Sequence, residues 1–143
     1  MENINNSGSG FQIKNLILLE SSFSRINNVV FDESVNNNFD INIEVGVNEK
    51  VITVTEEAIL VQKFRDIEQF KFKVKMIGVF ECIGDSLITN FDEFGRINGA
   101  AIIFPYIREH VTNLSLKAGI GAIFLPPVNF TKINKNDKQI QEY

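Results

Sequence analysis

The sequence has little of the chemistry on which enzymes and metal sites depend. It holds one cysteine, one histidine and no tryptophan among 143 residues. A single cysteine excludes an internal disulfide and favours a reducing compartment, so we expect a cytoplasmic protein. Residues 1–10 lack the basic and apolar regions of a signal peptide, and no apolar run approaches the ~18 residues that span a bilayer. We therefore expect no membrane insertion.

Positive charge and phosphate-binding loops are scarce too. The chain has 14 lysines and arginines against 18 aspartates and glutamates, a net charge of −4. Nucleic-acid binding needs a basic surface, so we predict no nucleic-acid partner. Gly119 and Gly121 follow a predicted helix rather than precede one, which excludes the usual glycine-rich phosphate loop. We predict no cofactor.

Cys82 and His110 are the only pair that could act as nucleophile and base. No third group is evident to orient the histidine, and a cysteine among apolar neighbours is usually buried and inert. Acidic pairs such as Glu56 and Glu57 are more simply explained as solvated residues than as metal ligands. We predict that the protein is not an enzyme and binds no metal. A small enzyme or ligand-binding domain that uses Cys82 and His110 remains the least favoured alternative.

Apolar residues, by contrast, are plentiful. They make up 44% of the chain, and thirteen of them are phenylalanines. That is enough for the core of one domain of this length. Because polar termini cannot bury enough surface to offset the entropy of ordering, we expect a loose tail over 1–10, one domain over 11–131 and a polar tail over 132–143.

Hydrophobic alternation predicts four strands. They cover residues 11–20, 39–47, 51–63 and 70–76. We expect a bulge near Glu56 and Glu57 and an extended linker over 21–38. The alternating lysines at 71, 73 and 75 are interpreted as a solvated face or an edge guard. Strands followed by helical sequence indicate an α+β fold with a four-stranded antiparallel sheet and C-terminal helices.

The helical part of the chain lies after these strands. Residues 85–90 read as a short helix and 91–95 as a turn. A longer helix is expected with Pro105 in its first turn and Gly119 at its end. Its apolar stripe contains Ile107, Val111, Leu114 and Ala118. The apolar segment 120–130 contains two prolines, so it is neither a long helix nor a central strand. We predict that this irregular segment and the helix form a groove.

Four short pieces of sequence resemble the SecB family of export chaperones. They are Phe11-Gln12-Ile13, the stretch Gly78-Val79-Phe80 with Ile83-Gly84, Phe104-Pro105-Tyr106-Ile107-Arg108-Glu109, and Leu125-Pro126-Pro127-Val128-Asn129-Phe130. The resemblance covers roughly residues 11 to 133. It implies a SecB-like fold that assembles as a homotetramer, a dimer of dimers. It also implies ATP-independent holding of non-native polypeptides in hydrophobic grooves and their delivery for export to the translocation motor SecA.

The resemblance also assigns residues to the groove that binds polypeptides. They are Phe39, Ile41 and Ile43 on one strand, Phe124 and Leu125 in the loop opposite, and Phe23 and Phe31 in the crossing linker. Any one of them, taken alone, is more simply explained as a residue of the core or of a subunit interface. Large exposed apolar patches mark binding sites for other chains, and apolar contact accepts partners of varied sequence.

Docking to SecA is where the sequence departs from the family. The family presents an acidic outer sheet face; Glu20 keeps one acid, but Ser24 and Lys73 replace others, and Lys71 stands beside Lys73. Like charges facing a basic partner weaken association. The alternative is a SecB-like chaperone dedicated to an antitoxin of a toxin–antitoxin system, which keeps the groove without the acidic face.

Overall fold

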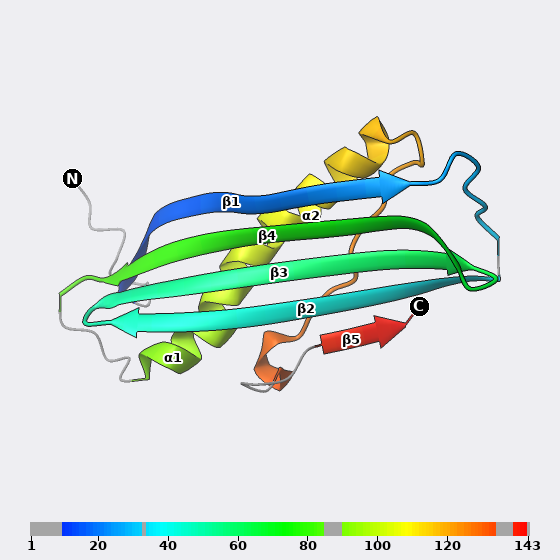
Figure 1. Cartoon of the computed structure of the whole chain (residues 1–143). Coiled ribbons are helices and arrows are strands. Elements are labelled where there is room, and N and C mark those ends of the chain that lie inside the picture. Colours follow the sequence, from blue (N-terminus) through cyan, green and yellow to red (C-terminus); the bar gives the residue numbers. More distant parts are fainter. Residues whose placement is uncertain (1–9, 33, 85–89, 134–138, 143) are drawn as a thin grey trace.

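The computed structural model in Figure 1 is one long sheet with a single long helix lying diagonally across one face. The structure describes residues 10–32, 34–84, 90–133 and 139–142. Its strands are β1 (Phe11–Arg25), β2 (Val35–Asn48), β3 (Val51–Phe64), β4 (Ile67–Cys82) and β5 (Gln139–Glu142). Its helical elements are α1 (Phe91–Phe94), the π-helical η2 (Gly95–Gly99), α2 (Ala100–Lys117) and the 3₁₀ turn η3 (Phe130–Lys132).

All pairings in the sheet are antiparallel, in the order β1-β4-β3-β2-β5. The predicted α+β fold with a four-stranded antiparallel sheet is confirmed. The fifth strand, β5, lies in the segment predicted as a polar tail, so that prediction is wrong for residues 139–142. An edge strand presents unpaired backbone groups, and an extended segment can pair with them whatever its side-chain pattern. The predicted tail over 1–10 lies outside the described residues except for Gly10.

Two strand predictions need correction. β1 continues to Arg25, so Phe23 lies in a strand opposite Phe72 and not in a linker. Serines on either side of Phe23 hide the apolar pattern, but an edge strand pairs through its backbone. The bulge expected near Glu56 and Glu57 is absent, because β3 and β4 stay in register there. Regular alternation therefore turns Glu56 into the core, where it is fully buried, and Glu57 outward.

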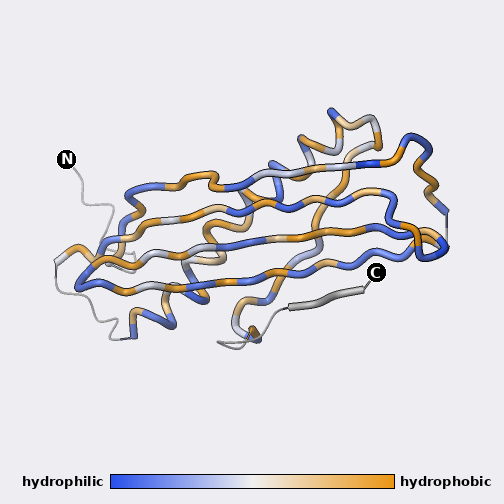
Figure 2. The backbone as a smooth tube through the Cα atoms, viewed as in Figure 1, coloured by the Kyte–Doolittle hydropathy of each residue, from blue (hydrophilic) through white to orange (hydrophobic). Residues whose placement is uncertain are grey.

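The core lies between the sheet and α2, and Figure 2 shows the alternation of apolar and polar residues along β2 to β4 that creates it. From α2, Ile103, Ile107 and Val111 are buried, which confirms the predicted apolar stripe in its central part. The helix comes close to β4 at Gly78, where an added Cβ would lie 2.9 Å from Ile103 Cδ1. A side chain at that position would force the Ile103 and Phe80 side chains to shift.

The ends of α2 differ in how well they were predicted. Pro105 lies inside the helix and not in its first turn, because helical structure already begins at Phe91. Pro105 and the residue four before it, Ala101, are both exposed, so the carbonyl that loses its hydrogen bond can bind water. At the other end Gly119 has a φ of 72°, and the Ile120 amide donates to the Ser115 carbonyl at 3.3 Å. This is the Schellman stop that Gly119 predicts.

The segment before α2 was predicted less well. Of the short helix expected over 85–90, residues 85–89 lie outside the described part of the chain. The expected turn over 91–95 is helical instead. The Asn90 side chain accepts a hydrogen bond from the Glu93 amide at 2.9 Å, an N-cap that begins α1. Asn90 followed three residues later by Glu93 resembles a capping box, which is the local signal for this helix.

Candidate functional site

The segment that follows α2 is fastened alongside the helix by two side chains. The Thr112 hydroxyl donates to the Ile123 carbonyl at 2.6 Å, and the Ser115 hydroxyl accepts from the Ile123 amide at 2.9 Å. Ser115 is fully buried, and its hydroxyl also donates to the Thr112 carbonyl at 2.7 Å. These bonds pair both backbone groups of Ile123 and fix the position of the segment along α2.

The position of Phe124 follows from this attachment. Its neighbour Leu125 is 3% exposed and belongs to the core, and Phe130 further along packs its ring 5.7 Å from that of Phe104. Successive side chains of an extended segment point to opposite sides. With Leu125 held inward, Phe124 points outward, and it is 70% exposed. Exposing a phenylalanine side chain to water is unfavourable in free energy unless a partner covers it.

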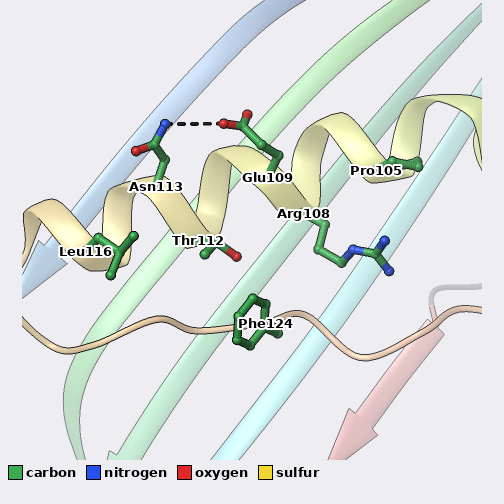
Figure 3. Close-up of a pocket in the computed structure, with 7 residues that line it drawn as sticks. All are labelled: Pro105, Arg108, Glu109, Thr112, Asn113, Leu116 and Phe124. Carbon is green, nitrogen blue, oxygen red and sulfur yellow. Dashed lines mark hydrogen bonds between the residues drawn. The ribbon is translucent and has the colours of Figure 1, made fainter.

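Phe124 and the outer surface of α2 line an open, mostly apolar hollow with a volume of about 430 Å³. Its lining residues are Pro105, Arg108, Glu109, Thr112, Asn113, Leu116 and Phe124. Figure 3 shows Thr112 and Arg108 extending toward the segment that carries Phe124, while Glu109 and Asn113 point away from it. Glu109 and Asn113 are joined by a hydrogen bond of 3.2 Å. We call this feature the α2 hollow. Its size suits a few side chains of an extended peptide.

The groove predicted between the helix and segment 120–130 is therefore present, but most of the residues assigned to it lie elsewhere. Phe39 and Ile41 are 0% exposed and Ile43 is 5% exposed. Their expected exposure to solvent is wrong, because they pack in one buried cluster with residues of α2 and of the segment that follows it; the Phe104 ring lies 6.4 Å from that of Phe39. The same correction applies to Leu125, which the alternation of its segment turns into the core.

Phe23 and Phe31 keep part of their surface free. Phe23 is half-buried with its ring 4.6 Å from that of Phe72, and Phe31 is 54% exposed, 6.2 Å from Phe70. The loop that carries Phe31 is held by Gln69, whose side chain accepts from the Val30 amide at 2.6 Å. These aromatics are thus fixed in position beside the end of β1.

The α2 side of the hollow was missed by sequence reasoning. The resemblance to the SecB family assigned no residue of this helix to the groove. The sequence signal for it was weak: Pro105, Glu109, Thr112 and Leu116 recur at steps of three and four on the face away from the buried stripe, but only Pro105 and Leu116 are apolar.

Cys82 and His110 are not brought together. The His110 Nε2 lies 2.8 Å from the Ser21 hydroxyl, whereas Cys82 pairs with Phe11 at the other end of β1. Ten residues of strand separate Phe11 from Ser21, roughly 30 Å at the rise of an extended chain. A nucleophile and its base need hydrogen-bond distance, so this pair is not a catalytic site. Among the described residues, no group of three or more His, Cys, Asp or Glu side chains is placed to hold a metal ion.

The outer face of the sheet carries the residues considered for SecA docking. Lys73 Nζ lies 3.3 Å from the Glu20 carboxylate and 3.8 Å from that of Glu57. Lys71, Lys73 and Lys75 share this face, as predicted, but they lie on β4 between β1 and β3, so they do not guard an edge. The solvated-face interpretation is the correct one, and Lys73 offsets the two acids beside it.

The fold and the site together define a class: an α+β domain with a single antiparallel sheet, one face closed by a long helix, and an apolar hollow on the helix's outer side. No helix in the described ranges is long and apolar enough to cross a membrane. The family model for the preprotein translocase subunit SecB matches residues 5–141. The chain belongs to the SecB family.

The chain is also similar to individual proteins, one of which carries the SecB name. The chain is 33% identical over 99 residues to a protein-export protein SecB of Methylobacillus flagellatus, covering 69% of this chain and 60% of that protein. It is 29% identical over 115 residues to an uncharacterized protein of Methanocaldococcus jannaschii, covering 78% of this chain and 74% of the other. Its fold matches the SecB-like chaperone Rv1957 of Mycobacterium tuberculosis, solved in complex with a ChAD peptide from the HigA1 antitoxin. That match has a TM-score of 0.71 at 14% identity and covers 83% of this chain and 91% of the other.

Proposed function

We propose that this protein is a cytoplasmic, ATP-independent holdase that binds non-native polypeptides and keeps them unfolded. The observation that carries the proposal is Phe124, 70% exposed and fixed beside the α2 hollow by the bonds of Ile123 to Thr112 and Ser115. Apolar contact has no direction, so such a hollow accepts side chains from clients of varied sequence. The family assignment supports the same activity.

Client contacts extend, in this proposal, beyond the hollow. An unfolded chain is long, and the exposed Phe31 and half-buried Phe23 offer further aromatic surface fixed on rigid elements. Rigid aromatics bind with little loss of conformational entropy. The core residues Phe39, Ile41, Ile43 and Leu125 are buried and are not part of the proposed contact surface.

The remaining exposed apolar surface supports assembly. Apart from Leu116 and Phe124, which line the α2 hollow, large exposed apolar side chains lie on β1 and on α2: Ile13, Ile17, Leu18, Leu19, Ile102 and Tyr106. A monomeric soluble protein rarely exposes contiguous apolar patches of this kind, and they mark contacts with other chains. We propose that β1 and α2 supply the contacts of a homotetramer built as a dimer of dimers.

The charges on the outer face of the sheet favour one of the two candidate partners, SecA or an antitoxin. Because Lys73 sits between Glu20 and Glu57, that face does not present the acidic surface that a basic partner such as SecA needs. This favours the second candidate, a chaperone dedicated to an antitoxin, in line with the antitoxin peptide bound to the structural neighbour Rv1957. Co-expression with a toxin–antitoxin pair separates the two: neutralisation of the toxin only in the presence of this chain supports the dedicated role, and preprotein export restored in a strain lacking SecB supports general export.

Holding itself is tested by aggregation. A chemically denatured model protein diluted into buffer without nucleotide is expected to stay soluble, by light scattering, when this protein is present at near-stoichiometric amounts. An equal mass of serum albumin serves as the control for non-specific protection. Aggregation that proceeds as in the albumin control would contradict the proposal.

A further inference from the structure

The two edges of the core sheet are protected to different degrees. β1 has register shifts between Ile13 and Asn15 and between Leu18 and Glu20, and it carries two cationic residues. Bulges and cations on an edge discourage pairing with further strands. β2 pairs with β3 without any register shift from Val35 to Asn48, and it contains no lysine, arginine or proline. β2 is therefore the edge on which another strand can be added.

In this structure the added strand is β5, the chain's own C-terminal segment. It pairs antiparallel with β2 at four positions, Asn38 to Ile41, of a strand that is fourteen residues long. Just beyond it, Arg96 Nη1 donates to the Ile43 carbonyl at 3.4 Å. A strand of four residues bound to a single neighbour is marginally stable, so it can leave at little cost.

The surface beside β5 can take side chains from a longer strand. A second hollow of about 270 Å³ lies at this edge, lined by Asn38, Phe39, Asp40, Ile59 and Val61. Alternate residues of a strand on the β2 edge face the same side as Ile59 and Val61. Backbone pairing supplies affinity without regard to sequence, while such a hollow favours apolar side chains at every second position.

We propose that β5 is a displaceable strand that covers the β2 edge, and that an extended apolar segment of a non-native polypeptide replaces it by antiparallel pairing with β2. This rests on the proposed function, because the partner is the client itself. The α2 hollow and the β2 edge then act on one client, the first through side chains and the second through the backbone. The fraction of molecules with a free edge sets the apparent affinity.

The test uses reduced, carboxymethylated α-lactalbumin as a permanently unfolded probe, with dissociation constants from fluorescence anisotropy. Deleting residues 139–143 is expected to tighten binding at least about threefold, since the free edge no longer competes with β5. Asp40→Cys with Ile140→Cys, made in a Cys82→Ala background, joins a directly opposed pair that suits a disulfide. The oxidised form is expected to bind at least about tenfold more weakly, and reductant should restore the affinity.

Hydrogen exchange gives a readout that does not depend on the disulfide. In the deletion variant, the probe should increase the protection of β2 amides from exchange. The Cys82→Ala single variant, which is the control for the disulfide variant, should bind the probe as tightly as wild type. Unchanged or weaker binding after deletion, or no new protection in β2, would overturn the displaceable strand. If Phe124→Ser still weakens binding in that case, the holdase proposal stands. If wild type does not bind the probe at all, the proposed function itself fails.

Discussion

Replacing Phe124 by serine is expected to weaken the binding of an unfolded polypeptide about tenfold or more. Covering a phenylalanine removes about 1.5–3 kcal/mol of unfavourable exposure, and 1.4 kcal/mol is a factor of ten in affinity. Because Phe124 is 70% exposed in the free chain, the fold should lose little, with the free energy of unfolding changed by about 0.5 kcal/mol or less. Anisotropy with the carboxymethylated probe measures the affinity, and urea denaturation measures the stability.

A matched control comes from Ile67, which is 63% exposed at the start of β4. Ile67→Ser removes a comparable exposed apolar side chain that does not line the α2 hollow. It should leave binding unchanged, whereas Leu116→Ser, inside the hollow, should weaken it in the same direction as Phe124→Ser. Equal losses for Ile67→Ser and Phe124→Ser would mean that general hydrophobicity, and not this site, holds the client.

Replacing Glu56 by leucine is expected to stabilise the protein at neutral pH by about 1–3 kcal/mol, the usual cost of an unpaired buried polar group. Glu56 is 0% exposed, and within the described part of the chain neither carboxylate oxygen has a hydrogen-bond partner. Its sheet neighbours are Ile43 and Met76. Burial among them raises the pKa of Glu56 well above its ordinary value of 4.5, since the charged form loses its hydration.

The direction of the pH dependence follows from that shift. In the unfolded chain Glu56 ionises above about pH 4.5, but in the folded chain it keeps its proton to a higher pH. The unfolded state therefore gains ionisation energy as pH rises, and folded stability falls through this range until the folded pKa is passed. The advantage of Glu56→Leu should accordingly grow as pH rises above about 4.5. Urea denaturation at several pH values measures it.

Glu57 is the control for this prediction. It lies on the opposite face of β3 and pairs with Lys73 and Lys75 at 3.8 and 3.9 Å, so that its charge, unlike that of Glu56, has partners. Glu57→Gln should change stability by about 1 kcal/mol or less and leave the pH profile intact. A Glu56→Leu variant that is less stable than wild type at pH 7 would show that the carboxyl has a stabilising partner.

The sheet could be predicted from the sequence because its pattern is local. Alternation along 39–47 and 70–76 reports which residues share a face, and the structure confirms both strands. The pattern does not report what covers a face. Phe39, Ile41 and Ile43 have the composition of an open groove wall, but residues of α2 and of the segment after it pack over them, and only the packing of distant segments decides that. β5 escaped prediction because its pairing depends on the backbone of β2.

The sequence predicted where the α2 hollow lies, but not most of the residues that line it. Prolines in segment 120–130 indicated an irregular wall beside a helix, and the α2 hollow lies there. Leu125 and Phe124 look equivalent in sequence, and the attachment of Ile123 to Thr112 and Ser115 determines which one faces solvent. Glu56 shows the same limit, because a carboxylate in an alternating strand reads as a turn or bulge until its neighbours show that it points into the core.

Site-specific photo-crosslinking tests most directly whether unfolded chains are held at the α2 hollow. A photoreactive phenylalanine analogue in place of Phe124 is compared with the same analogue in place of Thr55, on the outer face of β3. The account predicts strong crosslinks from position 124 to carboxymethylated α-lactalbumin, few from position 55, and none from either position to the native, disulfide-intact protein. Crosslinks at position 55 that equal those at position 124, or none at position 124, would contradict it.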